Sequence, residues 1–118
     1  MGYDIHITRK AEWFDAEPKI GLEEWEMYAS RDPLLSIEGS VGWKVGDKTV
    51  SAKVFVFRDP KNEKYPEAAV IAWQPFGDVV AKDPSTFGIA YMARIAYHLN
   101  ARVQGDEGEF YDLQGNPI

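Results

Sequence analysis

The sequence predicts an α+β protein: a single, mainly antiparallel β-sheet with two helices packed on one of its faces. Most of the chain consists of short segments in which apolar and polar residues alternate, as in half-buried strands. Only two segments have the apolar spacing of an amphipathic helix, and five strand-like segments follow one another between them. The 118 residues contain no linker or repeat, so residues 1–118 are expected to form one domain.

One strand and one helix are predicted in the first third of the chain. Residues 3–10 alternate, with Tyr or Ile at the first three odd-numbered positions and polar side chains between them. The helix is predicted for about residues 22–31, where apolar residues share one face and glutamates in the first turns suit the positive end of the helix dipole. Pro33 ends this helix, because the residue before a proline avoids the α conformation.

Five strands are predicted between the two helices. Residues 49–58 give the clearest pattern, with Val or Ala at every even-numbered position from 50 to 56. The other four predicted strands cover residues 34–37, 41–45, 68–74 and 78–82.

The second helix is predicted to begin with Asp83 as its N-cap and Pro84 at the first helical position, and to reach about Asn100. A last strand is predicted for residues 102–104. The acidic turn of residues 105–108 is then expected to bring Glu109–Tyr111 back beside this strand as a hairpin.

Composition excludes several classes of function. The net charge of −6 argues against direct binding to nucleic acid, which depends on clustered Lys and Arg. The absence of Cys excludes disulfides and thiolate metal sites. The longest apolar run, residues 68–73, is too short to cross a bilayer, and no apolar leader is present near the N-terminus. We therefore expect a cytoplasmic protein that does not bind membranes.

No set of residues in the sequence indicates catalysis. His6 and Asp4 share a strand face and could orient an imidazole for general base catalysis, although a hydrogen-bonded structural role is commoner for such a pair. The two histidines have no metal-ligand spacing, and the acidic turn lacks the ligand spacing of an EF-hand. Neither a Gly-rich phosphate loop nor a nucleophile elbow is found. The sequence therefore predicts no enzyme activity, metal site or cofactor.

Acidic and aromatic residues are the most informative feature of the chain. Residues 103–118 contain four acids and two aromatics without any Lys or Arg, and residues 11–32 are also strongly acidic. The aromatic residues are too numerous for one small core, so some are expected to be partly exposed, unless they only cap its open end. Exposed rings flanked by carboxylates suit a basic, partly apolar protein partner. The residues predicted to bind this partner are Trp13, Asp15, Glu17, Glu23, Glu24, Asp106, Glu107, Glu109, Phe110 and Tyr111.

Four segments also resemble one known family. They are YDIHITRKAEWFD at the start, IGLEEWEMYASRDP at 20–33, WQPFGDVVAKDP at 73–84 and LNARVQGDEGEFYD at 99–112. They resemble, in the same order, a family of small and largely uncharacterised bacterial proteins. Such stand-alone domains look like the immunity proteins of bacterial toxin systems, which are acidic, cysteine-free cytosolic proteins that plug the active site of a cognate toxin. The resemblance implies a toxin domain as the partner and carries no catalytic motif. Its shared positions mark either a common turn or a common surface: Trp25, Gly105, Asp106, Gly108, Glu109 and Tyr111.

Two alternatives remain open from the sequence. A small enzyme or ligand-binding domain would use a pocket between the sheet and the first helix, near Asp4, His6, Trp25 and Trp73. An adaptor protein would instead associate with itself through an edge strand.

Overall fold

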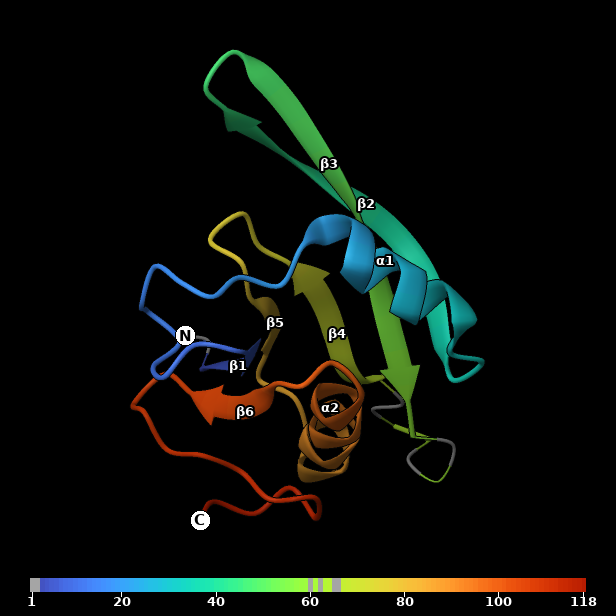
Figure 1. Ribbon diagram of the computed structural model, residues 1–118. Helices are drawn as coiled ribbons and strands as arrows, with labels where there is room; N and C mark the ends of the chain where they lie inside the picture. The colour runs from blue at the N-terminus through green and yellow to red at the C-terminus, as the bar shows by residue number, and fades with distance from the viewer. Residues whose placement is uncertain (1–2, 60, 62, 65–66) are drawn as a thin grey trace.

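The computed structural model describes residues 3–59, 61, 63–64 and 67–118 and has one six-stranded sheet with two helices (Figure 1). The sheet is antiparallel throughout, with the strand order β2-β3-β4-β5-β1-β6. The elements in chain order are β1 (Asp4–Thr8), α1 (Leu22–Arg31), β2 (Leu35–Val45), β3 (Lys48–Arg58), β4 (Glu67–Trp73), β5 (Val79–Lys82), α2 (Thr86–His98) and β6 (Arg102–Gly105). The predicted α+β class is confirmed. In the residues described, neither helix is long and apolar enough to span a membrane.

Both helices cover the same face of the sheet, as predicted. Phe55 and Phe57 lie two residues apart on β3 and therefore point to one face. Trp25 of α1 packs edge-to-face on Phe55 at 5.7 Å between ring centroids, and Tyr91 of α2 stacks on Phe57 at 3.8 Å. The hydrophobic core lies between this face and the two helices (Figure 1).

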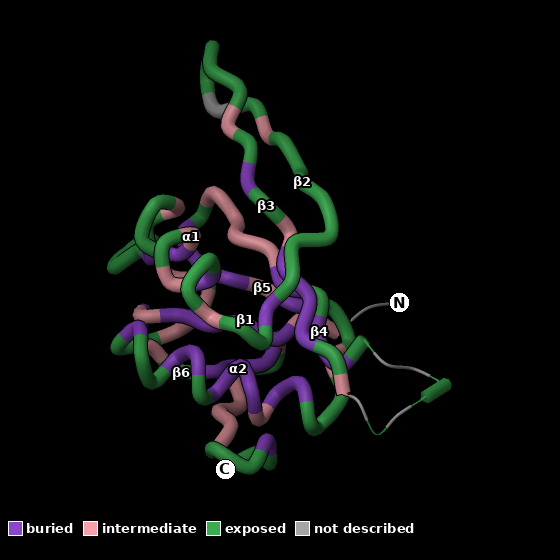
Figure 2. Tube along the Cα trace, turned by 90° about the vertical axis from the view of Figure 1, so that its right-hand side faces the viewer, coloured by how far each residue is buried: buried purple, intermediate pink, exposed green. Residues whose placement is uncertain are grey.

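The β2–β3 hairpin projects beyond the rest of the molecule, and its distal half is mostly exposed (Figure 2). Here the prediction of two separate strands, residues 34–37 and 41–45, was wrong. A bulge at Glu38 shifts the register between the pairs Ile37–Phe55 and Gly39–Val54. A bulge lets a strand bend without ending, so one strand of 11 residues forms in place of two.

The predicted start of the second helix was also wrong. The N-cap of α2 is Ser85, whose side chain accepts a hydrogen bond from the Gly88 N–H at 3.1 Å. Asp83 has a left-handed backbone with φ 47°, and its carboxylate accepts a hydrogen bond from the Tyr3 N–H at 2.9 Å. Because this carboxylate holds the start of β1, it does not cap the helix.

The C-terminal segment returns beside β6. Phe110 forms an isolated bridge with Gln104, and the Tyr111 N–H donates to the Val103 carbonyl at 3.1 Å. The predicted hairpin therefore forms, although it is short, and it covers the outer edge of β6.

Candidate partner-binding surface

The acidic turn of residues 105–108 is hydrogen-bonded to β1, so segments from the first and last parts of the chain lie side by side. Asp106 accepts hydrogen bonds from the Asp4 N–H at 2.9 Å and from His6 Nε2 at 2.8 Å. Glu109 accepts hydrogen bonds from the hydroxyls of Tyr3 and Tyr111. Of the three carboxylates predicted to bind a partner in residues 106–109, Asp106 and Glu109 are thus bonded within the molecule.

These bonds change the acidity of the groups involved. Burial raises the pKa of Asp106, but the hydrogen bonds from His6 and the Asp4 N–H outweigh it and leave this pKa below its usual value. Burial likewise raises the pKa of Glu109, and the two tyrosine hydroxyls outweigh it, so this pKa is also lowered. Burial and the bond to Glu109 raise the pKa of Tyr3 to about 12. Asp106 and Glu109 are therefore ionised at neutral pH.

The loop between β1 and α1 is held against the same turn. The Trp13 N–H donates to Gln104 Oε1 at 2.7 Å, and its indole Nε1 donates to the Asp106 carbonyl at 3.3 Å. Gln104 also donates from Nε2 to Glu12. Two segments about 90 residues apart in sequence thus form one continuous surface.

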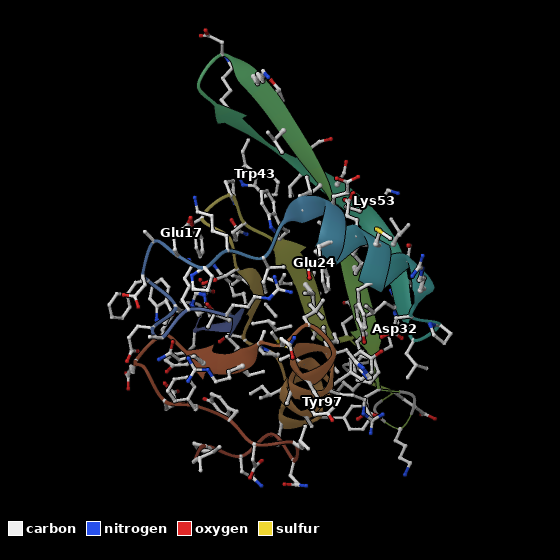
Figure 3. All side chains as sticks on the ribbon, viewed as in Figure 1. Glu17, Glu24, Asp32, Trp43, Lys53 and Tyr97 are labelled. Carbon is white, nitrogen blue, oxygen red and sulfur yellow. The ribbon has the colours of Figure 1, made fainter. Side chains whose placement is uncertain are left out.

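The exposed part of this surface is acidic and aromatic. The Phe14 side chain is 65% exposed. Glu17 and Glu107 are exposed, and Asp15 is half-buried, with one carboxylate oxygen accepting a hydrogen bond from the Glu12 N–H at 3.0 Å and the other left for a partner. Figure 3 shows Glu17 at the side of the molecule where this loop runs. We call Phe14, Asp15, Glu17 and Glu107 the acidic docking surface.

A buried polar cluster lies beneath the docking surface. The His6 imidazole stacks on the Trp13 ring at 4.2 Å, and its Nδ1 lies 3.7 Å from Asp78 Oδ2. Lys10 Nζ lies 3.4 Å from Asp78 Oδ1 and donates to the Phe76 carbonyl at 2.7 Å. The side chains of His6, Lys10 and Asp78 are at most 2% exposed.

This cluster fixes the loops on either side of it. Burial raises the pKa of Asp78, despite the nearby Thr8 side chain and the charge of Lys10. The imidazole pairs with Asp106 and Asp78, so the suggested His6–Asp4 pair was wrong. Sequence reasoning also missed Lys10, Gln104 and Asp78. The one available signal was spacing, since His6, Thr8 and Lys10 continue a single strand face.

Of the other predicted partner-binding residues, Glu23 and Glu24 lie on α1, whereas Phe110 and Tyr111 closely follow the acidic turn and pack inward. Both glutamates line a hollow of ≈ 660 Å³ between α1 and α2, and Figure 3 labels Glu24. Glu24 also pairs with Arg9. Phe110 packs against the Arg102 guanidinium at 4.7 Å from its ring centroid, and Tyr111 packs against the core.

The alternative pocket near Asp4, His6, Trp25 and Trp73 does not form. Trp25 is fully buried among the core residues. Trp73 pairs with the buried Val79 and donates from Nε1 to the Ile20 carbonyl, so it lies on the helix-covered face. His6 pairs with Val80, one residue further along β5, and therefore points to the opposite face. Successive side chains of a strand point to opposite faces of the sheet, so Trp73 and His6 cannot line one pocket.

No group of three or more His, Asp or Glu side chains able to hold a metal ion occurs among the described residues. Comparisons of the chain with protein-family models, curated proteins and solved structures found no match.

Proposed function

We propose that this chain is a non-catalytic binding protein that neutralises a basic toxin domain in the cytoplasm by covering the toxin's active site. The observation that carries the proposal is the acidic docking surface. Its exposed Phe14 ring lies in the same loop as Asp15 and Glu17, and the neighbouring turn adds Glu107. The resemblance to immunity proteins of toxin systems supports the same class of partner.

Charge supports the choice of a basic partner. The chain has a net charge of −6, and Asp15, Glu17 and Glu107 belong to a loop and a turn that the Trp13–Asp106 hydrogen bond joins. A field of this sign accelerates the approach of a cationic protein and sets its orientation. A toxin cleft lined by Lys and Arg to hold a phosphate-bearing substrate would have the complementary charge.

The docking surface is also preorganised. Trp13 is held by hydrogen bonds from its backbone and its indole and stacks on a buried imidazole. A loop that is ordered before binding loses less conformational entropy when the complex forms. Phe14 can then act as the apolar anchor, with the carboxylates forming the charged rim around it.

The test uses the product of the gene next to this one as the toxin candidate. Co-expression of the chain should restore growth that this product inhibits, and the two purified proteins should form a complex measurable by calorimetry. A neighbouring product that inhibits growth and neither binds the chain nor is neutralised by it would overturn the proposal.

Charge reversal locates the surface. The triple variant Asp15→Lys, Glu17→Lys and Glu107→Lys should weaken binding at least roughly tenfold, mainly through slower association. Phe14→Ala should cost about 2 kcal/mol of binding free energy if this ring is the anchor. The matched control reverses three exposed acids elsewhere, Asp47, Glu63 and Glu67, with the same change in net charge. Equal losses in the two triple variants would show that only net charge matters.

A further inference from the structure

A hollow of ≈ 340 Å³ lies on the face of the sheet that is turned away from the helices. We call it the sheet hollow. Its floor is apolar and consists of Val70 and Ala72 of β4 and Val80 of β5. Ala72 and Val80 are partners across the two strands, and Val80 also lies opposite His6, whose side chain points away from the helices. Val70 is 43% exposed, so a ligand can reach this floor.

The side chains around the floor carry charge and an exposed ring. They are Asp4, Gln74, Phe76 and Lys82. In the part of the chain that the structure describes, Asp4 Oδ1 is buried without a hydrogen-bond partner. Such an oxygen costs free energy, which a cation beside the same carboxylate would offset. Asp106, which accepts a hydrogen bond from the Asp4 N–H, adds a second negative charge against the single positive charge of Lys82. The sheet hollow therefore favours a cationic ligand.

Phe76 narrows the choice of cation to arginine. Its ring is 41% exposed, and Lys10 Nζ lies 5.1 Å from the ring centroid. Asp78 lies 3.4 Å from this ammonium and balances its charge, so the exposed part of the ring can accept a second cation. A guanidinium stacks on an aromatic ring while its N–H groups still donate to a carboxylate, which a lysine ammonium does less well. The aliphatic stem of an arginine would cover the apolar floor.

The sheet hollow is continuous with the acidic docking surface. The rings of Phe76 and Trp13 lie 6.5 Å apart between centroids, and Trp13 packs edge-to-face on Phe14 at 5.5 Å. Trp13 also stacks on His6, which lies opposite Val80 of the floor. One partner can therefore contact Phe14 and enter the sheet hollow at the same time.

We propose that the sheet hollow binds one arginine side chain of the toxin domain, with the guanidinium between Asp4 and Phe76 and the stem on the apolar floor. Gln74 offers an amide oxygen as a further acceptor. This inference rests on the proposed function, because it names the residue that the basic partner inserts beside the acidic docking surface. Arginine is one of the residues that contribute most to the affinity of protein interfaces.

A blocked arginine tests the sheet hollow without the toxin. In an NMR titration, N-acetyl-arginine amide should shift the signals of the residues that line the hollow until they saturate. N-acetyl-citrulline amide, its uncharged isostere, should bind at least roughly tenfold more weakly. Asp4→Asn and Phe76→Leu should each weaken arginine binding roughly fivefold. Lys82→Gln should strengthen it, because a like charge is removed. Equal binding of the two compounds, or native arginine affinity in Asp4→Asn, would overturn the site.

The matched controls change an acid and a ring outside the sheet hollow. They are Asp47→Asn, at an exposed position of the hairpin, and Phe87→Leu, whose ring is 47% exposed on α2. Neither should change the affinity for the blocked arginine. Thermal unfolding of every variant checks that the fold is kept, and Lys82→Gln tests the charge of the site without altering β1.

The toxin candidate tests the same residues in the complex. Asp4→Asn and Phe76→Leu should each raise its dissociation constant roughly tenfold, mainly through faster dissociation. A toxin candidate that binds both variants as tightly as the native chain would overturn the inference and leave the proposed function standing. If the blocked arginine binds as expected and the toxin candidate does not bind at all, the hollow keeps its class of ligand and only the proposed function fails.

Discussion

Asp106 connects the C-terminal turn to two segments near the N-terminus, and each of its three oxygen atoms accepts one hydrogen bond. One carboxylate oxygen accepts the Asp4 N–H and the other accepts His6 Nε2, while its backbone carbonyl accepts the Trp13 indole. Hydrogen bonds to a charged group are stronger than neutral ones, and a buried donor left without a partner costs further free energy. The neighbouring Glu107 side chain is exposed and no hydrogen bond of its carboxylate is found within the described residues.

Conservative amide substitutions should separate the roles of these two neighbours. Asp106→Asn should lower the free energy of unfolding by about 1.5–3 kcal/mol, because the charged acceptor for His6 is lost. Glu107→Gln should change it by less than about 0.5 kcal/mol, as for other exposed sites. Urea denaturation measures both values. If Asp106→Asn were as stable as Glu107→Gln, the inward role of Asp106 would be wrong.

Acid should destabilise the protein through Asp106 and Glu109. Their pKa values are lowered in the folded chain, so their ionised forms stabilise the fold at pH values above the usual carboxyl pKa. This contribution is lost as the pH falls through the lowered values. The free energy of unfolding, measured by urea denaturation at several acidic pH values, should therefore decrease toward low pH. Glu109→Gln should flatten this decrease, whereas an unchanged slope in both Glu109→Gln and Asp106→Asn would contradict the assignment.

The contact between α2 and β4 is set by a glycine. A Cβ on Gly88 would lie 2.0 Å from the Ala68 carbonyl oxygen, so the helix approaches the strand backbone closely at this point. Sequence reasoning placed this helix correctly in the fold but gave Gly88 no role, because a helical glycine carries no signal of what it faces.

Gly88→Ala should therefore be destabilising, although alanine is the better helix former by about 1 kcal/mol. Displacing packed backbone to admit a methyl group costs about 1–3 kcal/mol. Gly42→Ala is the control, since its Cβ would meet only ordinary contacts at 3.8 Å or more. It should change the free energy of unfolding by less than about 0.5 kcal/mol. Thermal and urea unfolding compare the two, and a stabilised Gly88→Ala variant would refute the close approach.

The elements that the sequence predicted well are those with a strong local period. In β1 and β3 the alternation of apolar and polar residues, and in α2 the apolar stripe, show which face of the element is buried. This information is contained in neighbouring residues of the sequence. The bulge at Glu38 and the use of Asp83 to hold Tyr3 depend on strands that are distant in sequence, so no local pattern shows them.

The candidate site was predicted less well for the same reason. Trp13, Asp15, Glu17 and Glu107 were identified by composition, and the hydrogen bond from the Trp13 indole to the Asp106 carbonyl joins the loop that carries the first three to the turn that carries Glu107. Composition does not distinguish a carboxylate that faces solvent from one that accepts hydrogen bonds across the fold. Asp106 and Glu109 belong to the second kind, since each accepts a hydrogen bond from a side chain about 100 residues earlier, His6 on β1 and Tyr3 just before it.

At the scale of the whole molecule, the acidic docking surface and the exposed β2–β3 hairpin lie at opposite ends of the sheet. The acidic docking surface lies beside β1 and β6, while β2 is the strand at the other end. The molecule is elongated, with extents of 44 × 30 × 29 Å, and the hairpin extends away from its body (Figure 1). Screening over about 8 Å at physiological salt further separates the two charge patterns.

We therefore expect partner binding to depend on the acidic docking surface and not on charge in the hairpin. Lys44→Glu should bind the toxin candidate with native affinity. The triple variant Asp15→Lys, Glu17→Lys and Glu107→Lys should lose most of its affinity, and the loss should be smaller at high salt because the interaction is screened. Calorimetry at two salt concentrations gives these affinities. If Lys44→Glu weakened toxin binding as much as the triple variant does, the toxin would have to contact the hairpin as well.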